Sequence, residues 1–220
     1  MQGNPLDEIV LIDKPQNITS YDVIRRLQKK YGKLKMGHAG TLDPMATGLM
    51  IIGVEKGTKR LQEFLKLDKT YEAEITLGIK TDTSDITGAV IEKTEPAVLK
   101  GLHIDEEKVK DILESLTGIQ SLPVSMYSAL KKEGKPLYAY AREGKEVEVP
   151  IRDMNIMNVE YISYDNNEYK IKAIFDVGSG TYIRSLAEEL GKRLGTAATL
   201  SALRRTRIGN YNVKDAEILE

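Results

Sequence analysis

The segment from Gly37 to Gly48 carries the residues best suited to chemistry. It reads Gly-His-Ala-Gly-Thr-Leu-Asp-Pro-Met-Ala-Thr-Gly, with an imidazole at His38 and a carboxylate at Asp43. Three glycines allow positive φ and the close approach of another molecule, and the proline after Asp43 disfavours helical backbone there. The apolar run Leu49–Val54 predicts a strand that would hold this loop rigidly. Composition alone nevertheless slightly favours a plain turn, in which Asp43 bonds a nearby amide and His38 lies at the surface.

The elements that would position this loop follow from the spacing of apolar residues. Alternation predicts several strands, and Asp165-Asn166-Asn167 would join the last two as an antiparallel hairpin. These strands are Ile9–Ile12, Lys69–Leu77, Asp153–Tyr164 and Tyr169–Val177. Helical spacing predicts one helix after a Thr19-x-x-Asp22 capping box, a second around Val109–Leu116, and a third over Tyr182–Leu194 that stops at Gly195. Helices and strands mix without a regular βαβ order, so the predicted fold class is α+β.

Charge is balanced overall but unevenly distributed. The 220 residues contain 32 Lys and Arg and 33 Asp and Glu, giving a formal net charge of −1. Basic residues dominate residues 24–60 and 181–210, whereas acids dominate residues 68–119. A polyanion could bind the basic segments, but solvated surface faces would give the same pattern.

Composition also excludes several classes of site. The chain has no Cys and only two His, so a cysteine-ligated zinc site or an iron–sulfur cluster is excluded. Chemistry must therefore run on carboxylates, hydroxyls and basic groups. No apolar run reaches the length of a membrane helix, and the first ten residues lack a secretory apolar stretch, so we expect a cytoplasmic protein.

The Gly37–Gly48 segment resembles the signature loop of the TruB-type tRNA pseudouridine-55 synthases, in which the aspartate is catalytic. Other segments resemble motifs of that family in the same order, and the resemblance spans about residues 9–219. These segments are Asp13-Lys14-Pro15, Thr19-Ser20-Tyr21-Asp22, Lys69-Thr70-Tyr71-Glu72-Ala73, Thr81-Asp82-Thr83-Ser84-Asp85, Tyr127-Ser128-Ala129-Leu130-Lys131, Tyr140-Ala141-Arg142-Glu143-Gly144, Gly178-Ser179-Gly180-Thr181-Tyr182-Ile183-Arg184-Ser185-Leu186 and Leu203-Arg204-Arg205-Thr206.

This resemblance implies a mixed, largely antiparallel central sheet with flanking helices. It implies an isomerase that converts uridine to pseudouridine at position 55, in the T-loop of tRNA. The partner would be the T-arm of tRNA. We expect the protein to be a monomer that does not associate with a membrane. Because the reaction is an isomerisation, we expect no cofactor and no metal. Family members commonly carry a C-terminal RNA-binding module of the PUA type, whereas here we expect one catalytic domain over residues 1–220 with no PUA domain.

The resemblance assigns three catalytic residues. Asp43 would attack the base or the ribose, or assist loss of a ribose proton, and the sequence leaves these routes open. Arg184 would offset the desolvation of Asp43 and help to position it. Tyr71 would stack on the flipped base, and its hydroxyl would take part in proton removal at carbon 5.

Further residues are expected to bind the substrate. His38 would fill the space left by the flipped nucleotide, Leu203 would line the uracil pocket, and Tyr182 would close its wall. Lys14 would pack beneath the site, and Gly40 and Thr41 belong to the signature loop. The candidates for phosphate contact, taken as a set, are Lys29, Lys30, Lys33, Lys35, Lys56, Lys59, Arg60, Lys131, Lys132, Arg204, Arg205 and Arg207.

Three alternatives stay open at this point. The protein could be a pseudouridine synthase acting on another RNA, or a noncatalytic RNA-folding module. The presence of Asp43, Tyr71 and Arg184 together argues against the noncatalytic module. A glycoside-cleaving enzyme would need a second carboxylate beside Asp43, for which Asp85 is the candidate.

Overall fold

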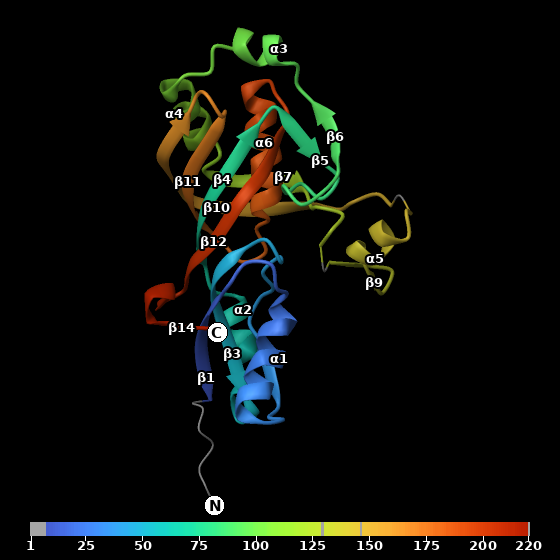
Figure 1. The fold of residues 1–220 in the computed structure, drawn as a ribbon, viewed down its shortest axis with the longest axis vertical. Helices are drawn as coiled ribbons and strands as arrows, with labels where there is room; N and C mark the ends of the chain where they lie inside the picture. Colours follow the sequence, from blue (N-terminus) through green and yellow to red (C-terminus); the bar gives the residue numbers. More distant parts are fainter. Residues whose placement is uncertain (1–7, 129, 146, 220) are drawn as a thin grey trace, which may run out of the picture. The chain divides into compact units, whose positions relative to one another are not determined.

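The computed structural model describes residues 8–128, 130–145 and 147–219. Ala129, which belongs to one of the motifs above, lies outside the described residues. The chain forms two compact units, one built from the residues up to Glu72 together with those from Leu203 onward, and one built from Ala73–Ala202. In Figure 1 the first unit runs from blue to teal and includes the red end of the chain, and the second runs from green through yellow to orange-red.

The first unit is built on strands around β3. Strands β1 (Ile9–Lys14) and β2 (Met36–His38) both pair with β3 (Thr47–Val54) in antiparallel fashion. The end of β12 (Ala198–Ile208) runs parallel to β3, with Arg204 opposite Thr47 and Arg205 opposite Gly48. Two short strands complete this part, β13 (Tyr211–Asn212) against β12 and β14 (Glu217–Ile218) against β1. β3 is buried along nearly its whole length, and strands pair with both its edges.

The predicted helix of the first unit begins at its capping box, and the shorter helices of this unit were not predicted. The Thr19 and Asp22 capping box opens α1 (Ser20–Tyr31), whose inner face buries Val23, Ile24 and Leu27. A short 3₁₀ turn, η1 (Glu55–Arg60), leads into α2 (Leu61–Leu65), and a second, η2 (Val213–Asp215), precedes β14. A core cluster of this unit contains Ala39, Leu49, Ile51, Phe64 and Ile208.

The second unit is built on strands in the order β12-β4-β11-β10-β7. These are β4 (Lys69–Leu77), β7 (Gly118–Pro123), β10 (Ile151–Asp165) and β11 (Lys170–Val177). The predicted hairpin is confirmed: β10 and β11 are antiparallel, and the Asp165 carboxylate accepts the backbone N–H groups of Asn167 and Glu168 in the turn. Two small hairpins stand apart, β5 (Ile79–Thr81) with β6 (Val90–Lys93), and β8 (Lys131–Lys132) with β9 (Lys135–Pro136).

The helices of the second unit are α3 (Pro96–Gly101), α4 (Glu106–Ser115), α5 (Leu137–Arg142) and α6 (Ile183–Leu194). Helix α4 packs on β10, and α6 packs on α4 and β7. Tyr182 is the residue that caps α6 rather than its first residue, and Gly195 ends the helix in the left-handed conformation, at φ +82°. The prediction of an α+β fold with a largely antiparallel sheet is confirmed. Among the described residues, no helix is long and apolar enough to cross a membrane.

Candidate active site

The loop that carries Asp43 connects β2 to β3 in the first unit. The backbone N–H of Ala39 donates to the carbonyl of Ile51 at 2.9 Å, so the start of the loop is fixed to β3 as well as its end. Gly40 and Gly48 both have positive φ, at +92° and +106°. A Cβ atom at Gly48 would lie 2.2 Å from the carbonyl oxygen of Arg205, so only glycine fits at this position.

Polar groups hold the backbone on both sides of Asp43. The buried Ser20 hydroxyl accepts the N–H of Leu42 at 2.8 Å and donates to the Leu42 carbonyl at 3.1 Å. On the other side, the Pro44 carbonyl accepts the backbone N–H of Asn17 at 2.8 Å and the Lys14 ammonium at 3.3 Å. The half-buried Asp43 is therefore flanked by two fixed residues, so its carboxylate starts from a restricted backbone.

Lys14 is a fully buried cation next to this loop. Its ammonium also donates to the carbonyls of Pro15 at 2.9 Å and Ile18 at 2.8 Å. Burial lowers the pKa of Lys14 from 10.5 to about 8, the Asp43 carboxylate partly opposes that shift, and the Arg205 guanidinium adds to it. Three carbonyl acceptors stabilise the ammonium where water does not reach.

Arg205 is buried, so its predicted contact with phosphate is wrong. Only 1% of its surface is exposed, and its guanidinium donates to the carbonyl of Leu49 at 2.8 Å and to that of Gly40 at 3.2 Å. The Arg205 backbone pairs with Gly48, whose missing Cβ leaves room for this close approach. Arg205 thus ties the loop to β3 and β12.

The neighbours of Arg205 on β12 also have partners within the protein. Arg204 forms an ion pair with Asp13, in which Nη2 of the guanidinium lies 2.6 Å from Oδ2 of the carboxylate. Arg207 donates to the Thr70 hydroxyl at 2.9 Å and to the Gly209 carbonyl at 3.0 Å. Charge alone could not distinguish these arginines from phosphate-binding ones.

The other candidates of the first unit occupy different environments. His38 ends β2 and is half-buried, and its Nδ1 is buried without a hydrogen-bond partner in the described part of the chain. Burial, and secondarily the charge of Arg205, lowers the pKa of His38, which favours the neutral ring. Thr41 is exposed, Tyr71 is half-buried on β4, and Leu203 is buried on β12.

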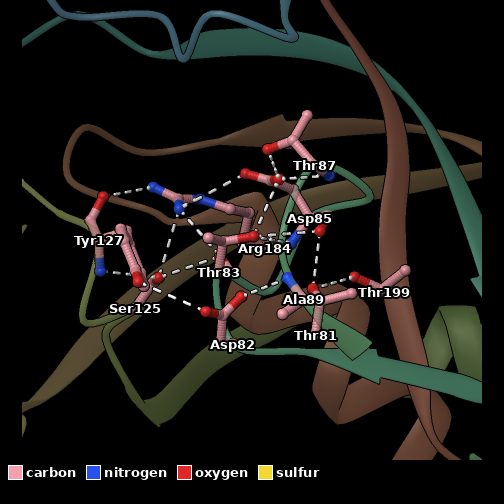
Figure 2. A network of polar contacts seen from close by, with 10 residues as sticks. All are labelled: Thr81, Asp82, Thr83, Asp85, Thr87, Ala89, Ser125, Tyr127, Arg184 and Thr199. Atoms are coloured by element: carbon pink, nitrogen blue, oxygen red, sulfur yellow. Dashed lines mark hydrogen bonds and ion pairs between the residues drawn. The ribbon is translucent and has the colours of Figure 1, made fainter. Parts of the chain in front are cut away.

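Arg184 belongs to the second unit, in the first turn of α6. Figure 2 shows its guanidinium between two loops, residues 81–89 and 125–127. It donates to the carbonyls of Thr83 and Tyr127, each at 3.0 Å, and to the Ser125 hydroxyl at 3.3 Å. The carboxylate of Asp85 lies 3.8 Å away, and both side chains are buried. A planar fork held by several acceptors has a fixed orientation.

Asp85 is committed to this network. One carboxylate oxygen accepts the hydroxyl of Thr83 at 3.0 Å together with the backbone N–H of Thr87 at 3.0 Å and the Thr87 hydroxyl. The other oxygen faces Arg184, as Figure 2 shows. With its acceptor positions occupied in this way, Asp85 is suited to holding Arg184 rather than to acting as the second acid of a glycosidase. The sequence contained the motif of Asp85 but gave no sign of this partner.

The structure distributes the predicted residues between the two units. Lys14, His38, Gly40, Thr41, Asp43, Tyr71 and Leu203 fall in the first unit, and Tyr182 and Arg184 fall in the second. Tyr182 is half-buried, and its carbonyl accepts the Ser185 N–H in the first turn of α6. The expected partnership of Asp43 with Arg184 stays a prediction. The described residues contain no cluster of three or more His, Cys, Asp or Glu that could hold a metal ion.

Comparison with known proteins identifies relatives that match nearly the whole chain. The model of the TruB family pseudouridylate synthase N-terminal domain matches residues 26–183. A protein of Aromatoleum aromaticum named tRNA pseudouridine synthase B is 43% identical over 219 residues, which cover 99% of this chain and 68% of the relative. A protein of the same name from Bordetella pertussis is 39% identical over 220 residues, covering 100% of this chain and 88% of that protein.

A solved structure supports the same fold. A chain in the crystal structure of a Cbf5-Nop10-Gar1 complex superposes with a TM-score of 0.70 at 26% sequence identity. The alignment covers 96% of the present chain and 52% of the solved chain. The present chain therefore spans about half the length of that structural relative.

Proposed function

Because the chain belongs to the TruB family of pseudouridylate synthases, we propose that it converts uridine to pseudouridine in tRNA, at position 55 of the T-loop. In this reaction the N-glycosidic bond of a uridine breaks, the uracil turns, and a carbon–carbon bond forms between carbon 5 and the ribose. A proton leaves carbon 5 and one is gained at nitrogen 1. The atoms balance without oxidation, so the reaction calls for no redox cofactor.

The observation that carries this proposal is the fixed backbone around Asp43. Ser20 holds Leu42 on one side, and Lys14 and Asn17 hold Pro44 on the other. A carboxylate placed in this way could attack the base or the ribose, or assist loss of a ribose proton, and in each case proximity replaces a costly encounter in solution.

Arg184 and Tyr71 complete the proposed catalytic set. Arg184 would stabilise the ionised form of Asp43 when RNA excludes water, and its own orientation is supported by Asp85 and two carbonyls. Tyr71 would stack on the extruded base, which recovers part of the free energy lost on unstacking. Its hydroxyl would assist proton removal at carbon 5.

The remaining candidates would shape the substrate pocket. Burial lowers the pKa of His38 and so favours the neutral ring, which suits stacking within RNA rather than contact with phosphate as a cation. Leu203 would contact the apolar face of uracil and Tyr182 would close the pocket wall. Gly40, which has no side chain, would let RNA approach the loop backbone, and the exposed Thr41 beside it would contact the RNA.

Modification of an unmodified tRNA transcript tests the proposal. We expect pseudouridine at the T-loop uridine on chemical mapping, and we expect Asp43→Asn to bind the RNA but to form no product. Pseudouridine at another site, or in another RNA only, would support the alternative synthase. RNA binding with no product by the unaltered protein would support a noncatalytic module. Action of residues 1–220 as one catalytic domain, as a monomer and in the cytoplasm, stays a prediction.

A further inference from the structure

The outer face of α1 is strongly cationic and carries an exposed aromatic ring. Val23, Ile24 and Leu27 point into the core, whereas the opposite face exposes side chains along its whole length. The exposed residues of this helix are Tyr21, Arg25, Arg26, Lys29 and Lys30, and the exposed Lys33 and Lys35 follow it. Asp22 is the acid of the helix, and its carboxylate is bonded by Thr19 and Arg25.

Helical geometry arranges these residues in two rows. Residues four apart lie on one face and about 6 Å apart along the axis. One row contains Tyr21, Arg25 and Lys29, and the other contains Arg26 and Lys30. We call these residues the α1 rows. Such a surface presents a line of positive charge to an extended polyanion.

Helix stability does not explain the α1 rows. Lys29 and Lys30 lie in the last turn, where cations interact favourably with the helix dipole, but Arg25 and Arg26 lie in the middle. The solvated face of α4 offers a comparison, because there acids and lysines alternate and Lys110 pairs with Glu106. Arg26 and Lys29 form no ion pair with any residue that the structure describes.

The α1 rows begin at the loop of Asp43. Ser20 is the first residue of α1 and is bonded to Leu42, the residue before Asp43. Tyr21 follows directly, is 57% exposed, and carries the Arg25 guanidinium 4.9 Å from its ring centroid. An aromatic ring and a guanidinium plane at this place can stack on an unpaired base, and the cations behind them can contact phosphates.

We propose that the α1 rows bind the RNA strand that leads to the target uridine. Tyr21, backed by Arg25, stacks on a base near the flipped nucleotide, while Arg26, Lys29 and Lys30 contact successive phosphates. This inference rests on the proposed function, since it takes RNA as the polyanion that meets Asp43.

The test compares two double variants that remove the same charge. Arg26→Gln with Lys29→Gln alters the α1 rows, and Lys100→Gln with Lys110→Gln alters exposed lysines in the acidic segment, residues 68–119. Glutamine keeps a helix propensity close to those of Arg and Lys, so both should fold, and thermal unfolding will check this. The readout is the dissociation constant for a T-arm hairpin across a salt series.

We expect the slope of log affinity against log salt to fall by about 1.4 to 1.8 in the α1 variant, because each lost phosphate contact removes roughly 0.7 to 0.9. The control variant should keep both the slope and the kcat of the unaltered protein. Equal slopes for the two double variants would overturn the proposal.

Tyr21 is tested separately because its contribution carries no charge. Tyr21→Ala should weaken hairpin binding about tenfold with an unchanged salt slope, and Tyr21→Phe should restore it. Full affinity in Tyr21→Ala would refute the stacking role. If the unaltered protein forms no pseudouridine but the slopes differ as expected, the proposed function fails and the RNA surface stands. If product forms and the slopes agree, the surface alone is wrong.

Discussion

The buried ammonium of Lys14 should leave a signature in the pH dependence of stability. Its pKa is about 8 in the folded protein and 10.5 in its ordinary environment, because burial disfavours the charge. Between these values the unfolded chain keeps the proton and the folded chain releases it. Stability rises with pH wherever the unfolded state binds more protons, so Lys14 makes the folded protein more stable as pH increases through this window.

The size of this effect follows from the two pKa values. At pH 7 the burial of the charge costs about 3 kcal/mol, and at pH 9.5 the cost has fallen to about 1 kcal/mol. Lys14→Met removes the titration and keeps a side chain of similar length. Between pH 7 and pH 9.5 the free energy of unfolding should therefore rise by about 2 kcal/mol more in the unaltered protein than in Lys14→Met.

Urea unfolding of both proteins at the two pH values measures this difference, and subtraction cancels the other titrating groups. Lys69 provides a matched comparison, since burial also lowers its pKa to about 8 while its ammonium donates to the carbonyls of Leu65 and Leu67. Lys69→Met should show the same pH signature. A difference that stays constant with pH, or one of opposite sign, would refute the argument.

Activity separates the two lysines. Lys14 holds the carbonyl of Pro44, next to Asp43, whereas Lys69 holds the carbonyls of Leu65 and Leu67 at the end of α2. We expect Lys14→Met to lower kcat about tenfold or more with little change in KM, which corresponds to about 1.4 kcal/mol in the barrier. Lys69→Met should lower kcat by a smaller factor. Equal losses in both variants would mean that the effect is one of stability and not of loop geometry.

Three further substitutions test the site. Ser20→Ala removes the hydroxyl that bonds the buried N–H and carbonyl of Leu42. We therefore expect the free energy of unfolding to fall by about 1 to 3 kcal/mol and kcat to decrease. Ser20→Thr should restore both. Arg184→Lys removes the planar guanidinium that bonds two carbonyls and faces Asp85, so turnover should fall on the order of a hundredfold. A normal rate would exclude the guanidinium from catalysis. Tyr71→Phe should keep RNA affinity and lose turnover at the final proton transfer, and loss of affinity instead would assign the hydroxyl to binding.

Much of the fold could be predicted because its signals are local. The capping box of Thr19 and Asp22, the turn at Asp165 and the stop at Gly195 each act within a few residues of the chain, and each is found in the structure. The loop of Asp43 was also identifiable, since its glycines and proline restrict the backbone whatever surrounds them.

The support of the site could not be predicted in the same way. Arg205 stands in an Arg-Arg-x-Arg run, which is typical of an exposed basic surface. Only the pairing of β12 with β3 shows that its backbone lies against Gly48 and that its side chain turns inward. The ion pair of Asp85 with Arg184 likewise joins segments that are distant in the chain, and neither segment alone indicates the other.

The contacts that the sequence could not predict share one physical cause. The acceptors that hold Lys14, Arg205 and Arg184 are mostly backbone carbonyls, which every residue carries and which leave no trace in the residue types. A cation at such a place looks in the sequence like a solvated charge, although it is buried and bonded. What the sequence does show is the position of Lys14, at the end of a strand that begins with the apolar run Ile9–Ile12. A cation in a buried strand must find acceptors, because leaving the charge without partners costs several kcal/mol. In this protein most of those acceptors, such as the carbonyls of Pro44 and Gly40, belong to loops whose geometry the proposed chemistry requires.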